Sequence, residues 1–211
     1  MRKIFLSLAV SSLFALSTYA QDTPRVDFVA GYSYLRSNPS QADNIPAGNL
    51  NGGIATFAYN INDHFAAEFD FGFYHNSGEV DNTSVSYMFG PRISYGRSRK
   101  LDPFVHALFG GMHSDISVDA ASSLVPPHPV QPLPMPSNKR YRASQANFAM
   151  ALGGGVDFHF TKGLYFRLAE FDYLLTRFEA PSFLTPTGAT SNRNQNNFRF
   201  ATGLGFNFGG L

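Results

Sequence analysis

The sequence predicts an all-β chain that folds into an eight-stranded antiparallel transmembrane up-and-down β-barrel. Three observations support this fold: eight segments alternate apolar with polar or small residues, the connections alternate in length, and an export signal precedes them. The last segment has the clearest pattern, with one parity formed by Phe198, Phe200, Leu204, Phe206 and Phe208. Side chains of a strand point alternately to its two faces, so an apolar outside and a polar inside are expected of a membrane barrel.

Residues 1–20 have the features of a secretory signal peptide. Arg2 and Lys3 are followed by a mostly apolar run over 4–16 and by the small-residue site Thr18-Tyr19-Ala20. The alternative is a membrane anchor, but the run is shorter than the roughly 20 residues that a spanning helix needs. We therefore expect a mature barrel domain over residues 21–211.

Composition excludes several classes of protein. The net charge of +1 argues against a nucleic-acid partner, since such binders carry a basic excess. The absence of cysteine excludes disulfides, thiolate metal sites and a lipidated cysteine. We expect no cofactor and no metal. The mature chain lacks an apolar run of spanning length, so a closed barrel is its one route across a membrane.

The first four predicted strands have different degrees of regularity. Val26 and Phe28 begin the outward face of the first, and the second is rich in glycine with an unclear parity. The third places Glu68 and Asp70 inward between outward phenylalanines. Pro91 in the fourth predicts a bulge or a strand end, because proline cannot donate to the ladder. These strands are predicted over residues 25–35, 50–59, 65–74 and 84–95.

The last four strands are predicted over residues 103–116, 144–160, 164–178 and 197–208. In the fifth strand His106 points inward. In the seventh, Arg167 and Asp172 have opposite parity, so both can face the interior only if a bulge lies between them.

The connections alternate in length along the chain. Short turns are expected at 60–64, 96–100 and 161–163, and long loops at 37–48, 75–82, 117–142 and 179–196. Bacterial outer-membrane barrels have this asymmetry, with short periplasmic turns and long external loops. Six tyrosines near strand ends suit the interfacial girdles of such barrels: Tyr34, Tyr74, Tyr95, Tyr141, Tyr165 and Tyr173.

The mature chain resembles the OmpA-like and OmpX-like outer-membrane β-barrels, a porin-like family. The resemblance rests on the signal peptide, on Gly31-Tyr32-Ser33-Tyr34, on Phe89-Gly90-Pro91-Arg92, on Pro103 to Gly111, and on Gly153-Gly154-Gly155-Val156-Asp157. Arg167, the pair Asp172-Tyr173 and the aromatic last strand also fit. It implies a location in the bacterial outer membrane, contact with membrane lipid and lipopolysaccharide, and delivery by periplasmic chaperones and the barrel-assembly machinery.

The chain departs from the family pattern at its end. Phe208 is followed by Gly209-Gly210-Leu211, so we expect no peptidoglycan-binding domain. The match to the terminal Phe that the assembly machinery reads is imperfect.

The interior of the predicted barrel receives a lumen charge network of Glu68, Asp70, Arg92, Asp157, His159, Arg167 and Arg199. Buried charges are costly unless they pair, and eight strands enclose a space that side chains can just fill. The network is therefore either an ion-pair plug or the lining of a narrow hydrated path. We expect Arg92 and Arg167 to reach Glu68 or Asp70.

Two histidines invite comparison with hydrolases, although we expect no enzymatic activity. His75 precedes Ser77 and Glu79, and His113 is followed by Ser114 and Asp115. Neither group matches a known catalytic motif, and a histidine at a strand end is more often a solvated polar residue.

The segment 117–142 is the most individual part of the chain. Its prolines favour extended polyproline conformation in a surface loop. Lys139, Arg140 and Arg142 form a basic cluster at its base, which could contact lipopolysaccharide phosphates or a surface partner.

The sequence thus predicts a structural or surface-interaction role with a mostly plugged lumen. A narrow porin-like channel for small solutes is the first alternative. A soluble periplasmic ligand-binding barrel is the second, although its repeated outward Phe would be an exposed apolar patch in water.

Overall fold

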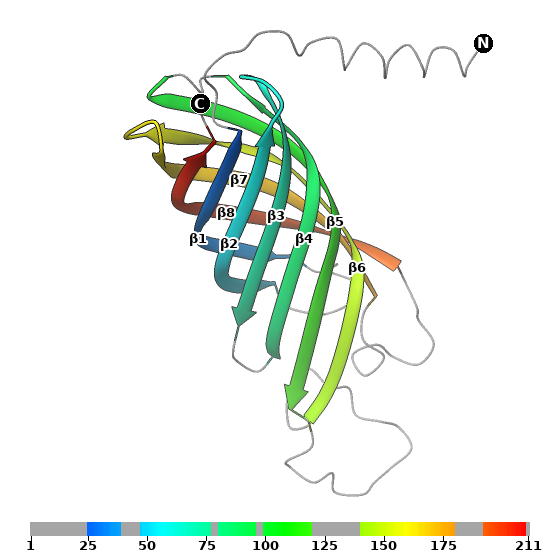
Figure 1. Ribbon diagram of the computed structural model, residues 1–211. Coiled ribbons are helices and arrows are strands. Elements are labelled where there is room, and N and C mark those ends of the chain that lie inside the picture. The colour runs from blue at the N-terminus through cyan, green and yellow to red at the C-terminus, as the bar shows by residue number, and fades with distance from the viewer. Residues whose placement is uncertain are drawn as a thin grey trace, which may run out of the picture.

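The structure, a computed structural model, describes residues 25–38, 47–76, 80–95, 99–119, 140–179 and 192–209, and these form eight β-strands. The strands are β1 (Val26–Ser37), β2 (Gly48–Asn60), β3 (Phe65–Asn76), β4 (Val80–Ser94), β5 (Leu101–Asp119), β6 (Arg140–His159), β7 (Leu164–Glu179) and β8 (Asn192–Phe208). Each strand pairs antiparallel with the next, and β8 pairs with β1. The closed up-and-down barrel that the sequence predicts is confirmed (Figure 1).

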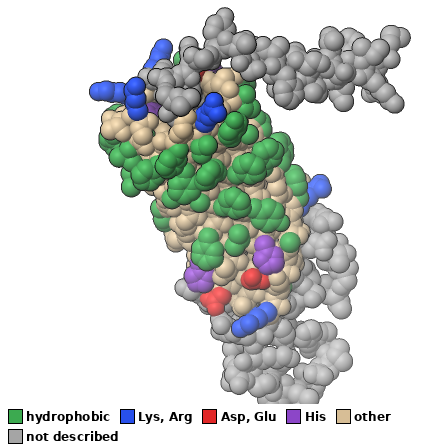
Figure 2. Space-filling model, in the orientation of Figure 1, with side chains coloured by type: hydrophobic (Ala, Val, Ile, Leu, Met, Phe, Trp, Pro, Cys, Tyr) green, Lys and Arg blue, Asp and Glu red, His purple; other side chains and the backbone are tan. Residues whose placement is uncertain are grey.

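Alternation along the strands separates an apolar outside from a polar inside. On β3, Phe69, Phe71 and Phe73 point outward and are about half exposed, whereas Glu68 and Asp70 point inward and are fully buried. Figure 2 shows the outward side chains as an apolar band across the visible face of the barrel. The same alternation resolves β2, where Ile54, Thr56 and Ala58 face the interior. No helix among the described residues is long and apolar enough to cross a membrane.

The two ends of the barrel differ in their connections. One end carries the connections 61–64, 95–100 and 160–163, together with the start of β1 and the end of β8, and we call it the turn end (Figure 1). The opposite end, called the loop end, carries 38–47, 77–79, 120–139 and 180–191. The predicted alternation holds except between β3 and β4, where a long loop was expected. That prediction is wrong because the β3–β4 ladder continues to the pair Asn76–Asn82.

Two irregularities were predicted, and one of them exists. The ladders of β7 with β6 and with β8 both shift between Arg167 and Glu170, so β7 contains the predicted bulge. The prediction at Pro91 is wrong: β4 runs through it without a shift in register. The ladder to β5 has no pair at Gly90 and Pro91 and then resumes in the same register, because only one donor is lost there.

The tyrosine girdle is also partly wrong. Tyr95 and Tyr173 are exposed on the outside as expected, but Tyr74 and Tyr165 are fully buried in the lumen. Both have inward parity on their strands, and parity decides the face whatever the distance from the strand end. Tyr34 is half-buried, and the side chain of Tyr141 lies outside the described residues.

Candidate functional site

Nine charged or ionisable side chains meet in the middle of the lumen, and we call them the lumen charge cluster. They come from the six strands β3 to β8 and are 0–5% exposed. The members are Glu68, Asp70, Arg92, His106, Asp157, Arg167, Glu170, Asp172 and Arg199. Five carboxylates thus face three guanidinium groups and one imidazole.

Arg199 of β8 joins three carboxylates. Its Nη1 donates to Asp70 Oδ1 at 2.6 Å and its Nε donates to Asp172 Oδ2 at 2.6 Å. Its Nη2 donates to Glu170 Oε1 at 3.2 Å. Because Asp70 lies on β3, this one side chain ties together strands on opposite sides of the lumen.

Arg167 pairs with Asp157 and Glu170 in place of the predicted Glu68 or Asp70. Its Nε donates to Asp157 Oδ1 at 2.9 Å and its Nη1 donates to Glu170 Oε2 at 2.5 Å. Arg167 and Glu170 are three residues apart on one strand and would have opposite parity in a regular strand. The bulge in β7 turns both into the lumen. The hydroxyl of Thr202 donates to the Arg167 carbonyl at 2.8 Å, which satisfies a backbone group at the irregularity.

Arg92 lies nearer the turn end of the cluster. Its Nη2 donates to Asp157 Oδ2 at 2.7 Å, and its Nη1 lies 3.6 Å from Glu68 Oε2, one of the two predicted partners. The guanidinium carbon stacks 3.9 Å from the centre of the Phe104 ring, and that of Arg167 lies 4.5 Å from the same ring. A cation held over an aromatic face gains electrostatic attraction in a desolvated site.

His106 bridges two carboxylates. Its Nδ1 lies 2.8 Å from Glu68 Oε1 and its Nε2 lies 2.7 Å from Asp172 Oδ1. A neutral imidazole has a single N–H, so two carboxylate partners suit a ring that donates from both nitrogens. This arrangement would add a fourth positive charge to the cluster.

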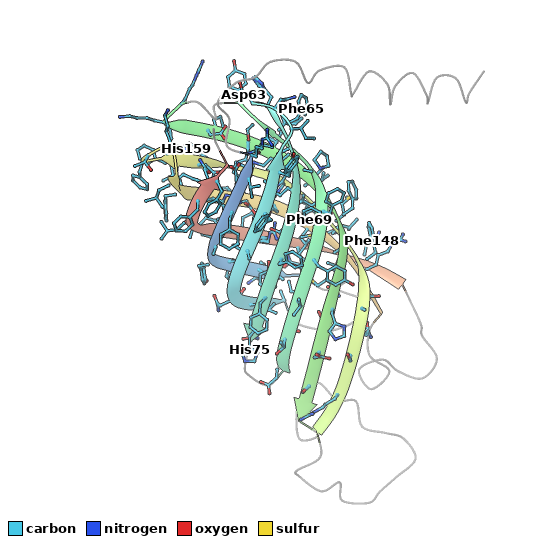
Figure 3. The ribbon with its side chains drawn as sticks, viewed as in Figure 1. Asp63, Phe65, Phe69, His75, Phe148 and His159 are labelled. Atoms are coloured by element: carbon cyan, nitrogen blue, oxygen red, sulfur yellow. The ribbon has the colours of Figure 1, made fainter. Side chains whose placement is uncertain are left out.

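The structure places six of the seven predicted lumen residues in this cluster. His159 is the exception: it lies at the turn end, its ring 5.1 Å from that of Tyr165, and its Nε2 makes no hydrogen bond within the described residues (Figure 3). The predicted network lacked three members, His106, Glu170 and Asp172, although the sequence placed His106 inward and allowed Asp172 to face inward beyond a bulge. His106 has inward parity, and the two acids follow the β7 bulge, so their parity could be read only after placing it.

A second, apolar layer closes the lumen on the loop side of the cluster. On β5, Leu108 and Met112 follow His106 toward the loop end, and on β7, Leu174 follows Asp172. The layer consists of Leu35, Leu50, Tyr74, Met88, Leu108, Met112, Ala149, Ala151 and Leu174, all 0–4% exposed. Water therefore has almost no access to either layer.

Three members of the cluster could in principle bind a metal ion. His106, Glu170 and Asp172 offer ligand atoms within 4.8 Å of one another. Both acids already bind the Arg199 guanidinium, and both nitrogens of His106 are already engaged by Glu68 and Asp172. Two guanidinium groups at Glu170 would repel a cation, so the arrangement suits an ion-pair cluster better than a metal centre.

The predicted hydrolase groups are arranged differently from a catalytic triad. Ser114 points into the lumen and bonds Ser84, so it is not beside His113. Instead Ser144 Oγ and Asp115 Oδ2 approach the same His113 nitrogen, Nε2, at 3.2 and 3.5 Å. A triad needs the hydroxyl and the carboxylate on different ring nitrogens.

The other predicted histidine group is only partly described. His75 contacts Thr83 Oγ1 through its Nδ1 at 3.0 Å, while Ser77 and Glu79 lie outside the described residues.

The predicted basic cluster is also only partly described. Arg142 is exposed at the start of β6, the side chain of Arg140 is not described, and Lys139 lies outside the described residues.

Comparison with known proteins supports the fold and identifies the family. A family model described as outer membrane protein beta-barrel domain matches residues 6–209. The crystal structure of Ail, the attachment invasion locus protein of Yersinia pestis, is 14% identical, with a TM-score of 0.56 over 88% of this chain and 99% of Ail. Neisserial surface protein A is 12% identical, with a TM-score of 0.55 over 87% of this chain and 97% of that protein. No curated protein sequence matches the chain significantly.

These similarities have different weight. At such low identity the two solved structures establish the fold alone, whereas the family match spans nearly the whole sequence. The chain belongs to the outer membrane protein β-barrel domain family and is a protein of the bacterial outer membrane.

Proposed function

We propose that the protein is a sealed outer-membrane barrel with a structural and surface-interaction role, and that it is neither a diffusion channel nor an enzyme. The observation that carries the proposal is the double closure of the lumen. The lumen charge cluster and the apolar layer follow one another along the barrel axis, and both are almost inaccessible to water. A solute would have to separate buried ion pairs and then cross an apolar constriction, and both steps are costly.

Planar-bilayer conductance tests this proposal. The mature chain would be refolded in detergent, checked for heat-shifted migration on a gel, and inserted into a bilayer. We expect no steady current above the empty-bilayer background. A double variant that removes one member of each layer, Arg92→Ala with Leu108→Ala, is expected to conduct if it still folds.

The alternative is a narrow porin-like channel, and the same recording distinguishes it. Stable steps from the unchanged protein that respond to Arg92→Gln or Arg167→Gln would establish a hydrated path through the cluster and refute the seal. Arg142→Gln is a matched control, because it removes the same charge from an exposed position outside the lumen.

A sealed lumen moves the search for activity to the outer surface and the loop end. Ail of Yersinia pestis, a similar barrel, was solved in complex with the heparin analogue sucrose octasulfate. By analogy, we expect Lys139, Arg140 and Arg142 to contact an anionic surface partner or lipopolysaccharide. Binding of sucrose octasulfate that is unchanged when all three become Gln would remove the basic cluster from the proposal.

The non-enzymatic part of the proposal has its own test. His113 and Ser144 form a histidine–serine contact that hydrolysis could use, yet Asp115 approaches the same ring nitrogen as Ser144 and not the opposite one. We expect no hydrolysis of lipid or peptide substrates above the buffer rate. Turnover that disappears with His113→Ala or His75→Ala would show that the proposal is wrong on this point.

A further inference from the structure

At the loop end, the outward face formed by β7, β8, β1 and β2 carries a row of arginines and asparagines. We call it the arginine–asparagine patch, and its exposed members are Arg36, Asn49, Asn51, Arg177, Asn194 and Asn196. These four strands are adjacent in the barrel, so the members share one side of the molecule. Arg36 lies four residues beyond Tyr32 on β1, or about 13 Å further along the strand. The patch therefore follows the aromatic surface at the depth expected of lipid head groups.

Hydrogen bonds orient the patch so that it offers donors to the outside. Nη1 of Arg36 donates to Asn49 Oδ1 at 2.8 Å, and Nε of Arg177 donates to Asn194 Oδ1 at 2.9 Å. A guanidinium group can only donate, so the two amide oxygens must face the arginines. Each amide then turns its Nδ2 donors away from its arginine. The arginines are also held in place before any ligand arrives, which lowers the entropic cost of binding.

Tyrosines extend the same arrangement toward the apolar band. The hydroxyl of Tyr32 donates to Asn51 Oδ1 at 2.6 Å, and that of Tyr173 donates to Asn196 Oδ1 at 2.5 Å. An amide oxygen that accepts from tyrosine again leaves Nδ2 as the donor for another partner. The row therefore runs continuously from amphipathic rings at the edge of the apolar band to cationic side chains above them.

Charge separates this face from the opposite one. Among the outward side chains described at the loop end, the acidic ones are Asp81 on β4 and Asp115 on β5, and Asp115 lies 3.5 Å from His113. Figure 2 shows that side, with histidine, acidic and basic side chains together below the apolar band. The arginine–asparagine patch has two cations and amide donors, and no acid among its described side chains. The described charges of the patch would therefore attract an anion at this depth.

We propose that the arginine–asparagine patch binds the phosphate groups of a phosphorylated glycolipid in the outer leaflet. Arginine suits phosphate because its planar donors match the phosphate oxygens, and the asparagine amides suit sugar hydroxyls and the remaining oxygens. A membrane lipid is favoured over a soluble anion because the row is continuous with the lipid-facing aromatic surface. The inference adds a second binding site, away from the basic cluster, to the surface role proposed above and does not depend on a sealed lumen.

The test measures binding of diphosphorylated lipid A to the refolded mature barrel in zwitterionic detergent by native mass spectrometry. For Arg36→Gln with Arg177→Gln, we expect binding weaker by roughly tenfold or more, since each charged hydrogen bond is worth about that factor. Asn49→Asp with Asn194→Asp keeps both arginines but replaces the outward amide donors by carboxylates, and we expect a comparable loss. A heat-shift gel confirms that each variant is folded.

A matched control removes the same charge elsewhere. Arg99→Gln with Lys162→Gln alters two exposed cations at the turn end, outside the patch, and is expected to change binding by less than about twofold, as exposed charges act weakly at a distance. Equal losses in both double variants would mean non-specific attraction and would overturn the proposal. Equal binding of dephosphorylated lipid A, or equally tight binding of inorganic phosphate, would overturn it as well. A conducting barrel with patch-dependent binding would refute the sealed lumen alone.

Discussion

Removing the Arg199 guanidinium should destabilise the barrel more than most single substitutions do. Arg199→Gln leaves Asp70, Asp172 and Glu170 without the donor that now lies within 3.2 Å of each. Five buried carboxylates would then face two guanidinium groups and His106. Removing one partner of a buried ion pair costs about 3–5 kcal/mol, because the remaining charge stays desolvated. That is a large part of the roughly 5–15 kcal/mol by which a typical domain is stable.

The assay must suit a protein without tryptophan. Folded fraction would be read from heat-shifted gel migration across a urea series in lipid vesicles, and the free energy of unfolding obtained by linear extrapolation. Arg142→Gln is the control, and a change within about 0.5 kcal/mol is expected at that exposed position. A loss below about 1 kcal/mol for Arg199→Gln would refute the reasoning, since it would mean that water solvates the cluster.

A double-mutant cycle separates the ion pair from the packing of the side chain. Asp172→Asn removes one of the acids that Arg199 now neutralises. The losses for Arg199→Gln and Asp172→Asn should therefore sum to more than the loss for the double variant, with a coupling of about 1–3 kcal/mol. Additive losses would contradict a direct ion pair between Arg199 and Asp172.

Three further substitutions and one deletion test local geometry by the same unfolding assay. Gly52→Ala should destabilise the barrel by roughly 1–3 kcal/mol, because its Cβ would overlap the β3 backbone, whereas Gly53→Ala should be tolerated with its nearest atom at 3.5 Å. Thr202→Val should cost about 1 kcal/mol, since it removes the hydroxyl that satisfies the Arg167 carbonyl. Deletion of Leu168 should leave the heat-shifted folded species intact, because Arg167 and Glu170 then lie two residues apart and both face the lumen in a regular strand without the bulge. Loss of the folded species on this deletion would contradict the assigned role of the bulge.

Much of the fold follows from the sequence because successive side chains of a membrane strand face two very different environments, lipid outside and the polar lumen inside. The outward phenylalanines of β3 and the inward Glu68 and Asp70 need no tertiary information to be assigned. Strand ends are harder, because a ladder can continue beyond the apolar band, as at Asn76–Asn82, where polar residues remain paired. The length of a connection is therefore harder to predict from the sequence than the number of strands.

The sequence predicts which residues face the lumen better than it predicts which of them form ion pairs. Parity indicated that Arg92 and Arg167 face inward, but it holds no information on how strands across the lumen are staggered. That stagger brings Asp157 to both arginines and leaves only Arg92 near Glu68. Glu170 and Asp172 lie beyond the β7 bulge, so a strict period of two counted from Arg167 assigns both of them to the outside.

The position of the charge cluster also bears on how this barrel acquires one register. The repeated phenylalanines outside exclude a slip by one residue, which would turn them into the lumen, but lipid accepts them again after a slip by two. The interior is more selective, because a slip of β8 by two residues would move Arg199 about 7 Å along the lumen, away from its three carboxylates. Leaving buried acids unpaired in this way costs about 3–5 kcal/mol. Since the cluster joins six strands, including Asp70 and Arg199 at 129 residues apart, each strand of that group is held in register by partners on others.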